Sequence, residues 1–99
     1  MLRSSYTQGP AVREREVEAY LVAAAKRAGG ECRKLCWIGR RGAPDRIVFL
    51  PGGRVIFFEL KAPGKKAEPH QAREHKRMQA MGQRVEVVDS FERIEEILS

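Results

Sequence analysis

Two apolar segments on either side of a Pro-Gly-Gly turn constrain the fold of this 99-residue chain most strongly. The apolar stretch runs from Ile47 to Phe58 and is broken only by Pro51-Gly52-Gly53-Arg54. Clusters of proline and glycine between short apolar runs are typical of turns that join neighbouring strands. The pattern therefore predicts an antiparallel hairpin, with one strand over residues 45–50 and the next over residues 54–61.

The length of the turn decides which side chains face each other across the hairpin. A two-residue loop would pair Asp45 with Leu60, whereas a three-residue loop, Pro51 to Gly53, pairs Asp45 with Glu59. The longer loop is favoured because proline suits the second position of a type I turn, and Gly53 can supply the left-handed residue that follows. A two-residue loop would also leave Pro51 in the ladder without an amide hydrogen to donate. We therefore expect Asp45 opposite Glu59.

Two opposed carboxylates can share a divalent cation. Directly opposed residues have Cβ atoms about 4.5–5.5 Å apart, which is close enough for both acids to reach one ion. Lys61 follows Glu59 by two residues, so both point to the same face of their strand. A cation beside an ammonium group suits hydrolysis of a phosphodiester bond. The alternative is an exposed Asp and Glu with a salt-bridged lysine. Glu59, however, interrupts a strand that has the pattern of burial on both faces, where an unpaired carboxylate is costly.

Size and charge narrow the class of protein. The formal net charge is +6, from 19 Lys and Arg against 13 Asp and Glu, and the pI is near 9.8. Such a charge is typical of nucleic-acid binding, although ordinary small proteins also reach it. No apolar run approaches the ~20 residues of a membrane span, and the N-terminus lacks the apolar stretch of a signal peptide. We expect one soluble, cytoplasmic domain over residues 12–99 after a flexible lead-in of residues 1–11.

The remaining segments predict an α/β fold of order αβββαβα, with a mixed sheet flanked by helices. Apolar periodicity and stop signals indicate the elements outside the hairpin. They are a helix over residues 12–28, a strand over 31–38, a helix over 69–81, a strand over 84–88, and a final helix capped by Ser90 that ends near Leu98. The apolar side chains of the final helix could form a dimer surface, but a core role is the favoured interpretation.

The cysteines and histidines carry little functional signal. Cys32 and Cys36 both fall in the predicted strand, about 13 Å apart, which is too far for a disulfide or a shared metal ion. We expect two small residues on one buried face rather than a zinc site. His70 and His75 lie among polar residues of the predicted helix over 69–81, and we expect both to be exposed.

Three motifs together resemble a known family. Arg41-Gly42-Ala43-Pro44-Asp45-Arg46, Glu59-Leu60-Lys61-Ala62-Pro63-Gly64 and His70-Gln71 resemble the virus-type replication–repair nuclease (VRR-NUC) domain in its short, stand-alone phage form, within the PD-(D/E)xK nuclease superfamily. The resemblance covers nearly the whole chain, residues 12–98. It implies a restriction-endonuclease-like core.

The resemblance also implies roles for particular residues. Asp45 and Glu59, with the carbonyl of Leu60, would hold Mg²⁺ or Mn²⁺, because such hard cations take oxygen ligands. Lys61 would orient or help deprotonate the attacking water, or offset charge that develops on the phosphate. Gln71 would hydrogen-bond within the site and steady Lys61 or the water.

A glutamate of the first helix would complete the metal site, through water or a second metal ion. Glu14 and Glu18 are four residues apart and share one helix face. Glu18 is favoured because it lies between the core positions Val17 and Leu21 and because its spacing to Gly29 resembles that of archaeal junction-resolving relatives. Glu14 is the alternate. Either residue could instead belong to a solvated helix face that carries ion pairs.

Basic residues near the motif ends indicate a surface for a phosphate backbone. Loops on both sides of the hairpin and the following helix supply them: Arg40, Arg41, Lys65, Lys66 and Arg73. On that helix, Arg73, Lys76 and Arg77 could extend the surface or could belong to an ordinary solvated helix face. Phosphate contacts contribute affinity and salt sensitivity rather than sequence reading. Few exposed aromatic residues are available for base stacking, so we expect recognition of DNA shape.

The resemblance implies a phage-encoded endonuclease that acts in a bacterial host. Stand-alone members cut branched DNA as homodimers that resolve Holliday junctions, and two symmetric nicks need the two active sites that a two-fold dimer supplies. The partners would be branched or duplex DNA and a second copy of the chain, with no membrane. The alternatives are a non-catalytic nucleic-acid-binding module of the same fold, or a nuclease directed at flaps, ends or RNA.

Overall fold

In the computed structural model, the helices and strands of residues 12–99 follow the predicted order. The structure describes residues 12–99, so the predicted lead-in, residues 1–11, lies outside the described residues. The elements are α2 (Glu14–Arg27), β1 (Glu31–Lys34), β2 (Arg46–Leu50), β3 (Arg54–Leu60), α3 (Pro69–Ala80), β4 (Val85–Val88) and α4 (Phe91–Leu98). Each boundary except the end of β1 lies within two residues of its predicted position.

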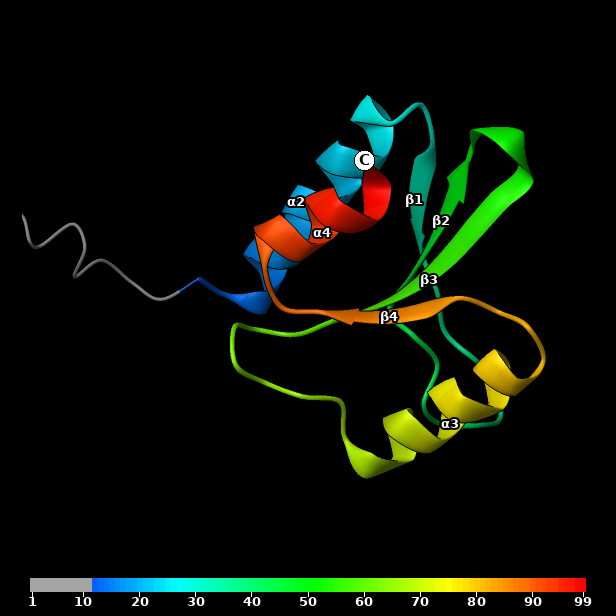
Figure 1. Cartoon of the computed structure of the whole chain (residues 1–99). Helices are drawn as coiled ribbons and strands as arrows, with labels where there is room; N and C mark the ends of the chain where they lie inside the picture. Colours follow the sequence, from blue (N-terminus) through cyan, green and yellow to red (C-terminus); the bar gives the residue numbers. More distant parts are fainter. Residues whose placement is uncertain (1–11) are drawn as a thin grey trace, which may run out of the picture.

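The four strands form one mixed sheet in the order β1-β2-β3-β4. β1, β2 and β3 are antiparallel neighbours, and β3 pairs with β4 in parallel after the crossover through α3. Figure 1 shows α2 and α4 side by side along one side of the sheet, with α3 apart from them on the other side of β4. The predicted mixed sheet flanked by helices is confirmed.

The β2–β3 hairpin has the three-residue loop that the sequence favoured. Leu50 pairs with Arg54, and Pro51 to Gly53 form a short 3-10 turn between them. The turn type differs from the expectation. Gly52 has φ 81° and ψ 15°, which fits the third position of a type II turn, and Gly53 is also left-handed, at φ 76°. Glycine at both positions allows this backbone, and the register is the same for either turn type.

Strand alternation assigns the two faces of the sheet to different helices. The apolar core lies between the sheet and the pair α2 and α4, and includes Leu21, Val48, Ile56, Phe58, Leu60, Val88 and Ile94. Residues of β3 next to these core positions point to the opposite face, where α3 lies. Glu59 is therefore directed at α3 rather than at the apolar core.

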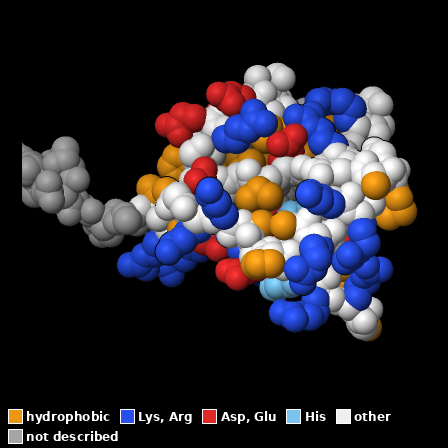
Figure 2. Space-filling view, turned by 60° about the horizontal axis from the view of Figure 1, so that its bottom comes forward, with side chains coloured by type: hydrophobic (Ala, Val, Ile, Leu, Met, Phe, Trp, Pro, Cys, Tyr) orange, Lys and Arg blue, Asp and Glu red, His pale blue; other side chains and the backbone are white. Residues whose placement is uncertain are grey.

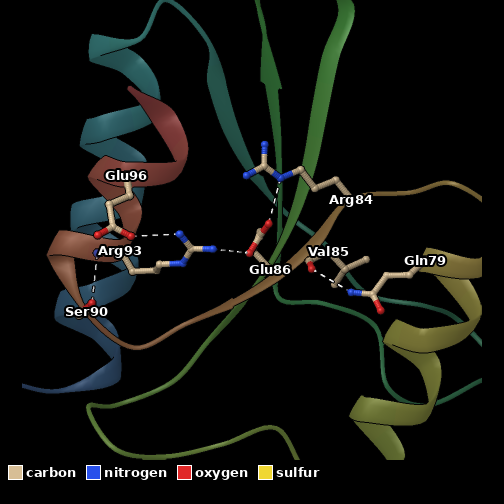
Figure 3. Close-up of polar contacts among 7 residues, drawn as sticks. All are labelled: Gln79, Arg84, Val85, Glu86, Ser90, Arg93 and Glu96. Carbon is tan, nitrogen blue, oxygen red and sulfur yellow. Dashed lines mark hydrogen bonds and ion pairs between the residues drawn. The ribbon is translucent and has the colours of Figure 1, made fainter.

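The apolar residues of α4 belong to the core, as the favoured interpretation held. Ile94, Ile97 and Leu98 are buried, and the ring of Phe91 stacks on Tyr20 at 4.5 Å between centroids. The predicted cap is also confirmed, because the Ser90 hydroxyl accepts a hydrogen bond from the amide of Arg93 at 3.2 Å, as Figure 3 shows. None of the helices within residues 12–99 has the length and apolar character to cross a membrane.

β1 is shorter than predicted, and this corrects the interpretation of one cysteine. The strand ends at Lys34, which pairs with Arg46, and only one further backbone bond, from the Leu35 amide to the Asp45 carbonyl at 3.0 Å, continues the ladder. Beyond it the chain turns away toward α3. Cys36 therefore lies outside the strand and is exposed, whereas Cys32 is partly buried against the core. Both cysteines are free.

Candidate active site

Asp45 and Glu59 lie at the same end of the hairpin. Asp45 immediately precedes β2, and Glu59 is the penultimate residue of β3. The observed register ends with Arg46 opposite Phe58, and one further step places Asp45 opposite Glu59. The Asp45 carboxylate accepts a hydrogen bond from the Leu60 amide at 2.8 Å, which holds it across the strand pair. The hairpin therefore brings the two acids together as its loop length predicted.

Glu59 is buried and has different partners on its two oxygens. Its exposed fraction is 1%. Oε2 accepts a hydrogen bond from Gln71 Nε2 at 2.8 Å and lies 3.4 Å from Lys61 Nζ. The other end of the Gln71 amide accepts from the Glu68 backbone amide at 2.8 Å, at the start of α3. Gln71 thus hydrogen-bonds within the site, but its bond runs to Glu59 rather than to Lys61.

The surroundings of Glu59 favour its neutral form. Burial is the main cause that raises its pKa, and the negative charge of Asp45 adds to it. The Lys61 ammonium lowers the pKa through its charge and a hydrogen bond, but only in part. The result is a pKa of about 7, compared with an ordinary value of 4.5. A buried acid this far from its usual range is frequent at sites that bind a cation or transfer a proton.

His75 is buried in this site, so the prediction that it is exposed was wrong. Its exposed fraction is 4%, and Nε2 lies 3.7 Å from Glu59 Oε1. Neither atom has a hydrogen-bond partner. Burial lowers the pKa of His75, which opposes a charge on the ring. His70, predicted to be exposed as well, is half-buried.

A helical stripe of polar residues could have identified this buried face. Gln71, Glu74, His75 and Met78 follow one another at spacings of three, one and three residues, which places them along one side of α3. The three polar members face polar partners on the sheet and on the loop before β2. Sequence reasoning missed Glu74 and His75 because a stripe that is mostly polar resembles a solvated helix face.

Glu74 joins α3 to the loop that precedes Asp45. Its exposed fraction is 4%, and it accepts hydrogen bonds from the indole of Trp37 at 2.8 Å and from the guanidinium of Arg40 at 2.7 Å. Arg77, one turn further along α3, donates to the same carboxylate at 2.9 and 3.0 Å. These bonds draw the chain after β1 away from the sheet and toward α3, which explains the early end of that strand.

Gly42 allows the loop to approach α3 closely. Its φ is +94°, and a Cβ atom there would lie 2.8 Å from Glu74 Cβ and 2.9 Å from the His70 carbonyl oxygen. A larger residue would therefore meet both backbone strain and a collision. The contact aligns the loop on α3 just before the chain enters β2 at Asp45.

Neither candidate glutamate of α2 contacts the two acids. Glu18 Oε2 pairs with the guanidinium of Arg46 at 3.0 Å. Arg46 lies opposite Phe58, on the face of the sheet that α2 covers, whereas Asp45 and Glu59 are directed at α3. Glu14 is exposed in the first turn of α2. Glu18 therefore contacts Arg46, the residue that follows Asp45, from the opposite face of the sheet.

The predicted basic residues surround the same end of the hairpin. Arg40 and Arg41 precede β2, and Lys65 and Lys66 follow β3, so antiparallel pairing places both loops at one end of the sheet. All four residues are exposed, as is Arg73 on α3. Figure 2 turns the α3 side forward and shows Lys and Arg side chains gathered over much of that surface.

Comparison with known proteins identifies the family. No sequence-family profile matches the chain. It is 49% identical over 79 residues to "Putative nuclease p44" of Acyrthosiphon pisum secondary endosymbiont phage 1, a match that spans 80% of this chain and 85% of that protein. A solved structure described as "VRR_NUC domain" superposes with a TM-score of 0.82 at 40% identity, over 89% of this chain and 96% of that chain. The chain belongs to the VRR-NUC family. The resemblance inferred from the three motifs is confirmed.

The donors of this VRR-NUC site fit a small hard cation. Within residues 12–99, no three His, Cys, Asp or Glu side chains are close enough together to enclose a metal ion. Mg²⁺ rarely needs such an enclosure, because it is usually held by one or two carboxylates, with water and substrate phosphate completing its ligands. Asp45 and Glu59 provide two carboxylates, and Glu59 Oε1 is a buried acceptor without a partner. A cation at this oxygen would satisfy it.

Proposed function

We propose that this VRR-NUC protein is a metal-dependent endonuclease that hydrolyses phosphodiester bonds in branched DNA, with the Holliday junction as its substrate. One observation carries the proposal. The buried Glu59 carboxylate lies beside Asp45 and Lys61, and one of its oxygens has no hydrogen-bond partner. A buried carboxylate with an unpaired oxygen lowers the stability of a folded domain unless it binds a cation.

Asp45, Glu59 and the carbonyl of Leu60 are the proposed ligands of Mg²⁺ or Mn²⁺. When bound, the cation would supply the positive charge that polarises a phosphate oxygen and activates water. The Leu60 amide holds Asp45, and Gln71 holds one oxygen of Glu59. Both acids are thereby oriented before a ligand arrives, which reduces the cost of organising the site.

Lys61 is the proposed partner of the attacking water or of the phosphate. Its ammonium is 3.4 Å from Glu59 Oε2, and its side chain is largely buried at the end of β3. A lysine in this position can orient the water through its ammonium group or offset charge that develops on the phosphate, and in its neutral amine form it can accept a proton from the water. Glu18 is the proposed further acid, with Glu14 as the alternate. The Glu18 side chain pairs with Arg46 and does not contact Asp45 or Glu59, so it would act through a bridging water.

The proposed DNA surface comprises the two basic loops and the exposed side of α3. Arg41, Lys65, Lys66 and Arg73 have exposed cationic ends, and Arg40 is held on Glu74 with its outer part in solvent. Two loops at one end of the hairpin could bracket a phosphate backbone on either side of the two acids. This arrangement supports recognition of DNA shape rather than of base sequence.

We further propose that the active form is a homodimer that acts in the cytoplasm of a bacterial host. One described chain supplies one pair of acids, whereas resolution of a four-way junction requires two coordinated nicks. A two-fold axis would provide them. The phage origin of the p44 relative supports the assignment to a phage-infected cell.

The experiment that tests the function is a substrate panel with purified protein. A labelled four-way junction, a 5′ flap and linear duplex are incubated with Mg²⁺ or with Mn²⁺, and the same panel is repeated with Asp45→Asn. We expect the junction to be cut fastest and the variant to be inactive. Binding without cleavage in either metal would favour the non-catalytic module, and faster cutting of the flap would favour the flap-directed nuclease.

A further inference from the structure

Two arginines from separate elements converge on a single buried carboxylate oxygen. Arg40 donates to Glu74 Oε1 at 2.7 Å from the loop before β2, and Arg77 donates to the same oxygen at 2.9 and 3.0 Å from α3. The second oxygen of Glu74 accepts the indole N–H of Trp37 at 2.8 Å. Both guanidinium groups therefore lie side by side above one acid.

This cluster has an excess of positive charge. Glu74 pairs with two arginines, and the sum of the three charges is +1. Glu86 also pairs with two arginines, Arg84 and Arg93, but Arg93 has a second acid, Glu96, so the charges of that group sum to zero. Burial opposes ionisation of Glu74, but the hydrogen bonds and charges of its partners outweigh burial and lower its pKa. The acid thus remains charged and holds both arginines in place.

The two guanidinium groups remain open to solvent on their outer sides. Each arginine side chain is 55% exposed, whereas that of Glu74 is 6% exposed. A guanidinium group has five N–H donors, and the bonds to Glu74 use only one on Arg40 and two on Arg77. The remaining donors, on two adjacent positive groups, match the several oxygens and the negative charge of a phosphate.

The position of the pair relates it to the acids of the active site. Glu74 is followed by His75, which lies against Glu59, and the loop that carries Arg40 continues through Gly42 to Asp45. The close contact of Gly42 with Glu74 and with the His70 carbonyl fixes the loop on α3. A phosphate held by the pair would therefore be near the reacting one but separate from it.

We propose that Arg40 and Arg77, positioned by Glu74, form a binding site for one backbone phosphate of DNA adjacent to the phosphate that is cut. This inference rests on the proposed nuclease function for the identity of the ligand. The two arginines belong to separate elements, the loop before β2 and α3, and their contacts with Glu74 bring them together. The role of Glu74 is to position the arginines.

The test is DNA binding without divalent metal, so that no cleavage occurs. Fluorescence anisotropy of a labelled junction gives the binding constant over a series of NaCl concentrations for the wild type, Arg40→Ala, Arg77→Ala and the double variant. We expect each single variant to bind roughly tenfold more weakly, as for loss of a charge-assisted hydrogen bond. In the double variant we expect the slope of log Kobs against log [NaCl] to become less steep by about 0.9, which corresponds to one phosphate.

The two arginines should also be coupled. Because they hold the same phosphate, the double variant should lose less affinity than the product of the two single losses. Unchanged binding by Arg77→Ala would overturn the proposal. Strictly additive losses with a slope change of about 1.8 would also overturn it, since they indicate two independent phosphate contacts. Arg77→Gln, which retains a donor to Glu74, replaces Arg77→Ala if the latter does not fold.

Arg93 provides a matched control. It lies on α4, donates to Glu86 of β4 at 3.3 Å and to Glu96 at 3.0 Å, and is 47% exposed, so it resembles Arg77 in chemistry but not in location. Figure 3 shows it between these two acids. Arg93→Ala should keep both the affinity and the salt slope of the wild type. An equal loss in this variant would show that the effects report general charge rather than a site.

The outcomes separate this proposal from the nuclease proposal. If the wild type cuts junctions but binding does not depend on Arg40 and Arg77, the phosphate site is wrong and the nuclease function stands. If binding depends on the pair as expected but no DNA is cut with either metal, the phosphate site stands and the nuclease function is wrong.

Discussion

Glu59 Oε1 faces His75 Nε2 at a distance of 3.7 Å, and both atoms are buried without a hydrogen-bond partner. Buried polar groups are nearly always satisfied, and one that is not costs about 1–3 kcal/mol. The metal-free domain therefore carries a strained polar centre beside Asp45. The first two predictions follow from the cost of this centre and from its relief by a cation.

The stability of the metal-free protein should fall as the pH rises. The pKa of Glu59 is raised to about 7 in the folded state from 4.5, so folding favours the protonated acid. The stability that protonated Glu59 contributes to the folded state is fully present below pH 4.5 and is lost as the pH rises through 7. The shift corresponds to roughly 3 kcal/mol in the free energy of unfolding. Urea unfolding in EDTA at a series of pH values measures it.

Glu59→Gln is the control for this pH dependence. Glutamine keeps the shape of the side chain but does not titrate, so the difference between wild type and variant isolates the contribution of Glu59 from that of other acids. Glu95 titrates in the opposite sense, because its hydrogen bond from Tyr20 lowers its pKa. Parallel curves for the two proteins would contradict a raised pKa at Glu59.

Divalent metal should stabilise the folded protein. A ligand that binds only the folded state adds about 1.4 kcal/mol at roughly ten times its Kd, which raises Tm by several degrees in a domain of this size. Differential scanning fluorimetry with MnCl₂ measures the shift. Asp45→Asn should abolish most of it. An equal shift in wild type and variant would place the bound ion elsewhere.

Lys61→Ala should abolish cleavage while DNA binding remains nearly unchanged. The ammonium is largely buried against Glu59, so we expect it to contribute to the chemical step rather than to the affinity for DNA. Single-turnover cleavage and anisotropy binding assays separate the two effects. The matched control is Lys65→Ala, an exposed lysine of the next loop, which should weaken binding and keep the chemical rate. Normal turnover by Lys61→Ala would remove the lysine from the mechanism.

Gly42→Ala should destabilise the protein by about 2–4 kcal/mol. The added Cβ would meet Glu74 Cβ at 2.8 Å and the His70 carbonyl at 2.9 Å, in a backbone at φ +94°. Gly39→Ala is the control, because Gly39 has a similar φ of +83° but nothing within 4 Å of its Cβ position. Gly39→Ala should lower the free energy of unfolding only by the cost of a left-handed backbone at alanine, about 1–2 kcal/mol. Equal losses in urea unfolding would show that the contact with α3 is unimportant.

Glu18→Gln and Glu14→Gln should separate the two candidate glutamates. Under the proposed role, Glu18→Gln slows cleavage, whereas Glu14→Gln leaves it unchanged because Glu14 is exposed in the first turn of α2. Neither change should lower Tm by more than a few degrees, since the Glu18–Arg46 pair is partly exposed. Full activity of Glu18→Gln would limit that residue to its ion pair with Arg46.

Several features of the site could be predicted because they depend on local geometry. The position of Pro51 and the two glycines selects a three-residue loop, and that choice alone sets the pairing of Asp45 with Glu59. The position of Glu59 within an apolar strand indicates its burial. The alternation of side chains along β3 then places Lys61 beside it. In each case the relevant residues are close in sequence, and one hairpin brings them together.

His75 could not be predicted in the same way. Its neighbours in sequence are polar, so local composition indicated an exposed helix face. Its burial depends on how α3 lies against β3, which is a relation between elements separated by the crossover loop. The same limitation applies to the length of β1, because the chain leaves the sheet to bring Trp37 and Arg40 to Glu74.

The sequence by itself determined the order of the elements, the hairpin register and the two acids with their lysine, because short-range backbone rules govern each of them. Only the tertiary structure decided which polar side chains of α3 enter the site and which face of the sheet each candidate acid approaches. Those relations depend on the packing of α2 and α3 on opposite faces of the sheet. Packing of this kind is set by the whole core rather than by any one segment.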